Sequence, residues 1–319
     1  MTLLPYLPAA KLAVCPEERR WLIEGLWADQ GVGIVGGEPK CCKSFLALDM
    51  AVAVAAGSPC LRRYAVPRPG TVLLFAAEDA LHVVRQRLDG ICAAAGLRID
   101  DLDLQVVTAP SLRLDLDTDR QRLEHTVAAL HPRLLLLDPF VRLHRIDENV
   151  SGEVAPLLAF LRQLQRDHQV AVVVVHHARK GAARARAGQA LRGSSEFHAW
   201  GDSNLYLRRA DHGLLLTIEH RAAPSPDAPL RLLLHADGDA LALETDDEQH
   251  HAAPEADPAE TVDDRVTGIL AEAPTPISLA SLRSLCHVRT ATLCQTLLRL
   301  AEQRRVIKTS AGYALPTQQ

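Results

Sequence analysis

Residues 31–56 read GVGIVGGEPKCCKSFLALDMAVAVAA, and this stretch decides the fold of the chain. Its apolar start, Val32 to Val35, predicts a buried strand. The apolar residues from Phe45 onward, set among alanines, predict a helix. Residues 36–42 between them carry two glycines and a proline, which are typical of a tight loop. The stretch therefore predicts a strand, a glycine-rich loop and a helix in succession.

Such a loop at a helix N-terminus binds phosphate groups, because backbone N–H groups and the positive end of the helix dipole surround the anion. The pattern G-x-x-x-x-G-K-S/T runs from Gly37 to Ser44. Within it Lys43 would contact the outer phosphates and Ser44 would bind magnesium. The loop residues expected to contact a nucleotide are Gly37, Glu38, Pro39, Lys40, Cys41, Cys42, Lys43, Ser44 and Phe45. An ordinary strand-turn-helix is the alternative.

Cys42 departs from the pattern, since it stands where the second glycine belongs. We expect a positive φ at this position, which costs a non-glycine residue on the order of 1–2 kcal/mol. Micromolar nucleotide binding corresponds to roughly 8 kcal/mol, so the change would weaken affinity about tenfold without abolishing it. Because Cys41 and Cys42 precede a helix, their thiolates are also expected to be favoured.

Two further acidic positions follow apolar runs. Four leucines at 134–137 end in Asp138, and an aspartate at the end of a buried parallel strand can hold magnesium, usually through water. Hydrolysis also needs a carboxylate that activates the attacking water. In many ATPases with this loop that glutamate follows the magnesium aspartate, but here Pro139 does. The base must therefore come from elsewhere, and two carboxylates, Glu78 and Asp79, follow the strand predicted at 71–76.

Composition limits the possible partners and compartment. The net charge is −4, so any nucleic-acid contact must be a local basic patch. Seven cysteines without a C-x-x-C pair indicate neither a disulfide framework nor a zinc ribbon. The first residues lack the features of a signal peptide. The sequence contains no run of 18 apolar residues, so we expect no membrane span. We therefore expect a cytoplasmic protein that does not act in a membrane.

The pattern of elements predicts an α/β fold and two globular regions. Continuous apolar strands alternating with helices indicate a parallel sheet covered on both faces, and four short strands from Asn204 predict an antiparallel extension. Residues 1–245 would form this domain, and the acidic, Ala/Pro-rich residues 246–262 a linker. Residues 263–319 predict three helices and a hairpin, as in a winged helix-turn-helix, which binds DNA or docks a protein. Its recognition helix and wing would present Arg289, Thr290, Thr292, Gln295 and Lys308.

The blocks GGEPKCCKSFLALDMAVAVA, LLFAAEDA, LLLLDPF, VVVVHHARK and ALRGSSEFHAWGDSNLYLRR together resemble the RecA-type ATPases. Within that group they are most similar to the plasmid RepA replicative-helicase type and related predicted ATPases. The resemblance covers roughly residues 20–245. It implies a RecA-like P-loop fold, ATP and Mg²⁺ as ligands, and a homo-oligomer such as a hexameric ring.

The resemblance also implies roles for single residues. Glu78 rather than Asp79 aligns with the catalytic glutamate of the family. His176 ends the strand after Asp138, where a polar γ-phosphate sensor is expected, although a histidine merely ending the strand is the alternative. An arginine near Arg208 and Arg209 reaches the nucleotide of the neighbouring subunit as a finger in the family. Which of the two does so here is left open, as is a plain surface role.

A basic loop at residues 178–195 follows the sensor strand. Its basic residues are Arg179, Lys180, Arg184, Arg186 and Arg192. In the resembling rings this position carries the loop that contacts DNA phosphates, and the resemblance implies single-stranded DNA as its partner here. A solvated surface is the alternative, and the loop holds no aromatic side chain for base stacking.

The leading functional hypothesis is a magnesium-dependent, ATP-hydrolysing, DNA-associated motor or helicase of the RecA/RepA type. The alternative is a DNA-binding regulator or loader, in which ATP switches oligomerisation without unwinding. A small-molecule kinase fits poorly, because no acceptor or lid signature is present and the basic loop would have no role.

Overall fold

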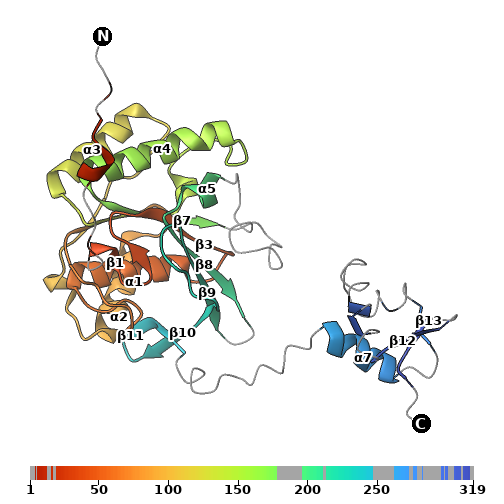
Figure 1. Ribbon diagram of the computed structural model, residues 1–319. Coiled ribbons are helices and arrows are strands. Elements are labelled where there is room, and N and C mark those ends of the chain that lie inside the picture. Colours follow the sequence, from red (N-terminus) through yellow and green to blue (C-terminus); the bar gives the residue numbers. More distant parts are fainter. Residues whose placement is uncertain are drawn as a thin grey trace. The chain divides into compact units, whose positions relative to one another are not determined.

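The fold was analysed in a computed structural model of the full chain (Figure 1). The structure describes residues 4, 6–12, 16, 19–177, 196–210, 213–246, 262–272, 276–278, 282, 296–297, 299–300, 305–309 and 312–316. By its contacts the chain divides into two units, residues 1–246 and 247–319.

The larger unit is built on a nine-stranded sheet with the order β11-β10-β9-β8-β3-β7-β6-β4-β5. The strands are β3 (Val32–Gly37), β4 (Val72–Ala76), β5 (Leu104–Val106), β6 (Leu134–Asp138), β7 (Ala171–His177), β8 (Ser203–Arg209), β9 (Leu214–His220), β10 (Leu230–Asp237) and β11 (Ala240–Thr245). Strands β3 to β8 pair in parallel, as the continuous apolar runs predicted. A short hairpin, β1 (Trp21–Ile23) and β2 (Trp27–Ala28), precedes the sheet.

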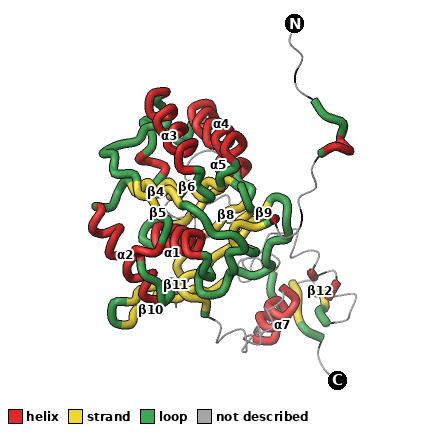
Figure 2. The backbone as a smooth tube through the Cα atoms, turned by 90° about the vertical axis from the view of Figure 1, so that its left-hand side faces the viewer, coloured by secondary structure: helices red, strands yellow, loops and turns green. Residues whose placement is uncertain are grey.

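Helices cover both faces of the sheet (Figures 1 and 2). The helices α1 (Lys43–Ala56) and α2 (Leu81–Ala94) lie on one face, and α3 (Asp117–Leu130), α4 (Ser151–His168) and α5 (Glu196–Trp200) on the other. Short 3-10 helices lie at η1 (Ala9–Lys11), η3 (Ile99–Asp101) and η4 (Phe140–Arg142). Side chains of a strand alternate between faces, and both faces are buried here. The central strands are therefore apolar along most of their length, and polar residues such as Asp138 and His176 stand at their carboxyl ends.

The antiparallel extension begins one strand later than the sequence indicated. β8 runs parallel to β3, with Gly36 opposite Tyr206 and Gly37 opposite Leu207. β9, β10 and β11 then pair antiparallel in sequence. The prediction that all four strands from Asn204 form the antiparallel part was therefore wrong for the first. As a result, the end of β8 lies at the same sheet edge as the ends of β3 and β7.

The smaller unit has its own apolar core. Its described elements are α7 (Val262–Glu272) and an antiparallel hairpin of β12 (Ile307–Thr309) and β13 (Gly312–Ala314). The core residues are Val266, Leu270, Leu282, Leu297, Leu300 and Val306. The hairpin lies where the wing was predicted, but Arg289, Thr290, Thr292 and Gln295 lie outside the described residues. The winged helix-turn-helix therefore stays a prediction.

None of the helices in the described part of the chain has the length and apolar character needed to cross a membrane.

Gly33 gives a direct test of the pairing between β3 and β8. A Cβ at this position would lie 1.7 Å from the carbonyl oxygen of Ser203 on the paired strand. Because that carbonyl belongs to the sheet, it cannot move away without breaking the pairing. We expect Gly33→Ala to lower the free energy of unfolding by about 3 kcal/mol or more, the upper end for overpacking. The midpoint of urea unfolding measures it.

Gly152 in α4 supplies the control for that substitution. A Cβ there meets no heavy atom within 4 Å. Alanine in a helix is favoured over glycine by roughly 0.5–1 kcal/mol, so Gly152→Ala should stabilise slightly. If Gly33→Ala unfolded at the wild-type midpoint, the parallel pairing of β3 with β8 would be refuted.

Candidate active site

The predicted site residues gather at the carboxyl ends of the parallel strands. Gly36 of β3 lies opposite His176 of β7 and opposite Tyr206 of β8, and Ala76 of β4 lies opposite Asp138 of β6. Ligands of open α/β sheets bind at this edge, where the loops after the strands converge. The fold therefore brings the loop after β3, the acidic strand ends and the predicted sensor to one place.

The loop between β3 and α1 has the shape of a phosphate cradle. Gly37 has φ 155°, and a Cβ there would lie 2.2 Å from the carbonyl oxygen of Leu207. α1 begins at Lys43, and its N-cap residue Cys42 makes no side-chain capping hydrogen bond. The first N–H groups of α1 are therefore left without a side-chain cap, as an anion site requires.

Two residues of this loop other than glycine adopt the left-handed conformation. Cys42 has φ 61°, as expected from its position in the motif, and Lys40 also has φ 61°. Each such residue costs on the order of 1 kcal/mol. Sequence reasoning missed Lys40, because the motif leaves that position free.

Lys43 lies inside the loop and is almost completely buried. Its Nζ donates a 2.6 Å hydrogen bond to the carbonyl oxygen of Glu38. Burial lowers the pKa of the amine, an effect that the nearby Cys41 and Asp138 side chains partly offset. An ammonium group held against the loop backbone fits the predicted role of binding the outer phosphates.

Ser44 and Asp138 meet between α1 and β6. Asp138 lies on the same strand face as Leu134 and Leu136, which pack toward α1. Its carboxylate accepts a hydrogen bond from the Ser44 hydroxyl, while burial, above all, raises its pKa to about 6. A hydroxyl and a carboxylate are ligands that suit magnesium.

Within the described ranges, no group of three or more His, Cys, Asp or Glu side chains is arranged to hold a metal ion. A magnesium ion bound at Ser44 and Asp138 would therefore complete its coordination with phosphate oxygens and water, as is usual for this ion.

The two carboxylates after β4 have different partners. Glu78 is about half exposed, and its Oε1 lies 3.2 Å from Nε of Arg142, which is also exposed. Asp79 instead forms an ion pair with Arg87 of α2. Exposed pairs of this kind contribute little stability. The Glu78 carboxylate is thus held loosely at the open edge of the site, where a water molecule can reach it.

His176 is buried and packed among aromatic rings. Its ring stacks on Phe197 of α5, with centroids 4.3 Å apart, and meets the edge of Phe140 at 6.0 Å. Phe197 comes directly after the segment that contains the basic loop. The predicted sensor position is therefore in contact with the element that follows this loop.

Arg208 and Arg209 end β8 and point to opposite faces of the sheet. Arg208 shares its face with Tyr206, and Arg209 shares the α1 face with Leu207. Arg209 Nη2 donates a 2.7 Å hydrogen bond to the carbonyl oxygen of Lys40 in the same chain. Both arginines are exposed.

The expectation of reactive thiolates is wrong for the loop cysteines. Burial raises the pKa of Cys41 and of Cys42 above its ordinary value, and nearby cations offset this only in part. Cys41 is completely buried, and its thiol donates a 3.5 Å hydrogen bond to the carbonyl oxygen of Leu207. The side chain of Phe45 is likewise buried in the core, so only its backbone can contribute to nucleotide binding.

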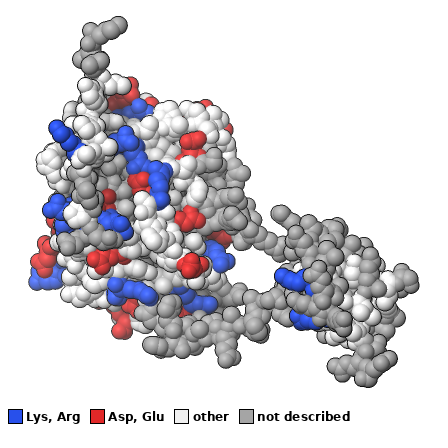
Figure 3. Space-filling model, viewed as in Figure 1, with Lys and Arg blue, Asp and Glu red and all other residues white. Residues whose placement is uncertain are grey.

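The basic residues Arg179, Lys180, Arg184, Arg186 and Arg192 lie outside the described residues. On the face of the molecule drawn in Figure 3, basic and acidic side chains are interspersed over the larger unit. This agrees with the small net charge of −4.

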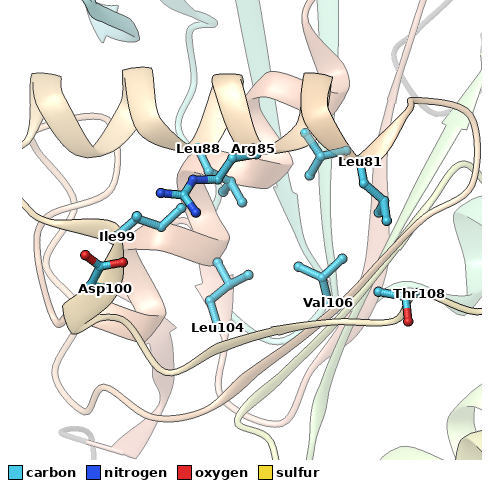
Figure 4. A pocket seen from close by; sticks show the side chains of 9 residues that line it. Leu81, Arg85, Leu88, Ile99, Asp100, Leu104, Val106 and Thr108 are labelled. Carbon is cyan, nitrogen blue, oxygen red and sulfur yellow. The ribbon is translucent and has the colours of Figure 1, made fainter.

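An apolar cavity of about 320 Å³ lies between α2 and β5 (Figure 4). Leu81 and Leu88 line it from the helix, and Leu104 and Val106 from the edge strand. Its lining includes no residue predicted to bind the nucleotide. The cavity is therefore separate from the candidate active site.

Comparison with known proteins agrees with this geometry. A family model described as an AAA domain matches residues 2–183, more than half of the chain. A solved DnaB-like replicative helicase, studied with its interactions with primase, is similar with a TM-score of 0.52 and 13% identity. The match covers 67% of this chain and 57% of the helicase chain.

A RadB recombinase matches with a TM-score of 0.47 and 17% identity, over 64% of this chain and 87% of that one. At 13% identity, the likeness to the helicase supports the fold alone. The match to the family model is what assigns the chain to a family. The chain belongs to the AAA domain family, and it is an ATPase with the RecA-like P-loop fold that its motifs predicted.

Proposed function

We propose that this ATPase is a magnesium-dependent, DNA-associated motor that resembles the hexameric RepA-type helicases. The observation that carries the proposal is the grouping of Lys43, the Ser44–Asp138 pair and Glu78 at one sheet edge. In the sequence, the basic loop comes directly after β7. We also propose that the protein acts in the cytoplasm.

Each residue of the group has a distinct task in this proposal. Lys43 and the first N–H groups of α1 bind the phosphates, and Ser44 and Asp138 hold magnesium. A bound magnesium ion supplies positive charge that offsets the charge developing on the transferred phosphoryl group. Glu78 orients or deprotonates the attacking water. His176 would donate to the terminal phosphate only after its ring leaves the stack with Phe197, because the ring is buried on the sheet face opposite α1.

The proposed assembly is a homo-oligomer whose sites are completed in trans. An arginine finger from the neighbouring subunit would stabilise the transition-state charge, and Arg208 or Arg209 would supply it. DNA, in the form of a single strand, would contact the basic loop through its phosphates. The smaller unit would add a winged helix-turn-helix that binds DNA or a partner protein.

The basic loop should account for a measurable part of DNA affinity. Replacing both Arg184 and Arg186 by Ala is expected to weaken single-strand binding by about tenfold. It should also reduce the slope of log K against log salt by roughly 1.4, since each phosphate contact contributes about 0.7. Fluorescence anisotropy over a salt series measures both quantities.

Arg85 and Arg98 provide the matched control, because both are exposed arginines with a partner aspartate nearby. Their double replacement by Ala removes the same charge and should leave the salt slope as in the wild type. An unchanged slope in the Arg184/Arg186 variant would remove the loop from the DNA site.

A regulator or loader is the second candidate function. In it ATP binding switches oligomerisation, and the smaller unit recognises DNA or a protein without unwinding. The net charge of −4 and the lack of aromatic residues in the basic loop favour this candidate, since tight single-strand binding relies on stacking.

Strand displacement on a forked DNA substrate separates the two functions. A motor displaces the strand only with ATP and magnesium, and its ATPase activity rises with single-stranded DNA. ATPase stimulation by single-stranded DNA without any displacement would rule out the helicase activity and leave the regulator.

A further inference from the structure

The loop between β3 and α1 is held by β8 of the same chain at two adjacent residues. Arg209 Nη2 donates to the carbonyl oxygen of Lys40 at 2.7 Å, and the Cys41 thiol donates to the carbonyl oxygen of Leu207 at 3.5 Å. Hydrogen bonds from a guanidinium group are stronger than those between neutral groups. The middle of the loop is therefore tied to the end of the neighbouring strand.

These two contacts fall where the loop backbone is least favourable. Lys40 and Cys42, on either side of Cys41, both have φ 61°. Residues other than glycine populate this conformation rarely, and they remain in it when surrounding contacts fix it. The contacts from β8 act on Lys40 itself and on Cys41, which is next to Cys42.

The direction of the arginine follows from the strand. Arg209 lies on the same face of the sheet as Leu207, the face covered by α1, whereas Arg208 lies on the opposite face with Tyr206. β8 can reach the loop because it pairs in parallel with β3, the strand from which the loop emerges. Gly37, at the start of the loop, lies opposite Leu207 in that pairing.

We propose that Arg209 is a positioning residue that acts in its own subunit. It holds the loop in the conformation that binds phosphate. Its hydrogen bond offsets the backbone strain at Cys42, a position where glycine would adopt the positive φ without strain. This inference rests on the proposed nucleotide site. It leaves Arg208 as the arginine that can serve the nucleotide of a neighbouring subunit.

Nucleotide affinity is the first measurement. Titration with a fluorescent ATP analogue and magnesium should show about five- to tenfold weaker binding for Arg209→Ala. Arg209→Lys should recover part of the loss, because an ammonium group can donate to the same carbonyl. Arg85→Ala removes an exposed arginine elsewhere and should bind as the wild type does. Wild-type affinity in Arg209→Ala would overturn the inference.

A double-mutant cycle with Cys42→Gly tests the positioning role itself. Glycine adopts a positive φ without strain, so the loop of Cys42→Gly should need Arg209 less. In that background Arg209→Ala should weaken binding by less than about twofold. An equal loss in both backgrounds would overturn the positioning role, since it would indicate a direct contact with the nucleotide.

Mixing of subunits tests whether Arg209 acts in its own chain. At an ATP concentration too low to saturate Arg209→Ala, its mixture with Lys43→Ala should show no more turnover than Arg209→Ala does alone, because neither chain then has a complete loop. Regained turnover would overturn the inference, since Arg209 would act on the neighbouring subunit. Failure of the wild type to bind the analogue would instead refute the proposed nucleotide site, before any variant is compared. Thermal unfolding of each variant verifies that it is folded.

Discussion

Glu78→Gln is expected to lower ATP turnover at least about 100-fold while nucleotide affinity stays within about twofold of the wild type. General base catalysis contributes about 10²–10⁴ in rate. Glutamine keeps the size of glutamate but cannot accept the proton from water. The Glu78 side chain is half exposed and, within the described part of the chain, forms an ion pair with the exposed Arg142, so its replacement should not disturb packing. Phosphate release and titration of an ATP analogue measure the two quantities.

Asp79→Asn is the matched control, since it neutralises the adjacent carboxylate. Asp79 is engaged with Arg87 of α2, so its loss should reduce turnover less than about threefold. If Asp79→Asn were inactive and Glu78→Gln active, the base would be Asp79 and the assignment would be reversed.

Lys43→Ala is expected to remove ATP turnover down to the background of the assay. The ammonium group lies inside the loop beside the carbonyl of Glu38, and charge-assisted contacts to phosphate are among the strongest available. Lys11→Ala removes the same charge from the short helix η1, outside the sheet, and should keep wild-type turnover.

Stability distinguishes loss of function from loss of fold in this variant. Burial lowers the pKa of Lys43, which means that the folded chain disfavours its charged form. Removing the buried amine should therefore leave the unfolding temperature unchanged or raise it. An unfolding temperature several degrees below the wild type would indicate a structural role for the lysine instead.

The architecture of the larger unit could be predicted because its strands are buried on both faces. Runs such as residues 134–137 and 171–175 have few interpretations other than central parallel strands. The direction of β8 was not predictable in the same way. Short strands separated by turns suggest hairpins. β8 instead pairs with β3, and the paired residues Gly33 and Ser203 are 170 positions apart in the sequence.

The core of the site was predictable because its residues are fixed by local spacing. Lys43 and Ser44 follow the loop directly, and Asp138 ends an apolar run. The protonation state of Cys41 and Cys42 could not be predicted. The sequence shows that these cysteines precede a helix, but it does not show how far they are buried. Burial of Cys41 and Cys42 outweighs the helix N-terminus and raises the pKa of both thiols.

The contact between Arg209 and Lys40 was also beyond sequence reasoning. It joins residues far apart in the chain, and it depends on the face to which Arg209 points and on the parallel pairing of β8. The partners of Glu78 and Asp79 are similarly tertiary. The sequence suggested Glu78 by resemblance, whereas the structure shows that Asp79 is the carboxylate engaged with α2.

Phosphate release by the wild-type chain, with Lys43→Ala as the baseline, tests the central claim most directly. We predict turnover that requires magnesium, that rises several-fold with single-stranded DNA and that is absent from the variant. Equal phosphate release by the wild type and Lys43→Ala, with and without DNA, would contradict the assignment of this loop as the site of ATP hydrolysis.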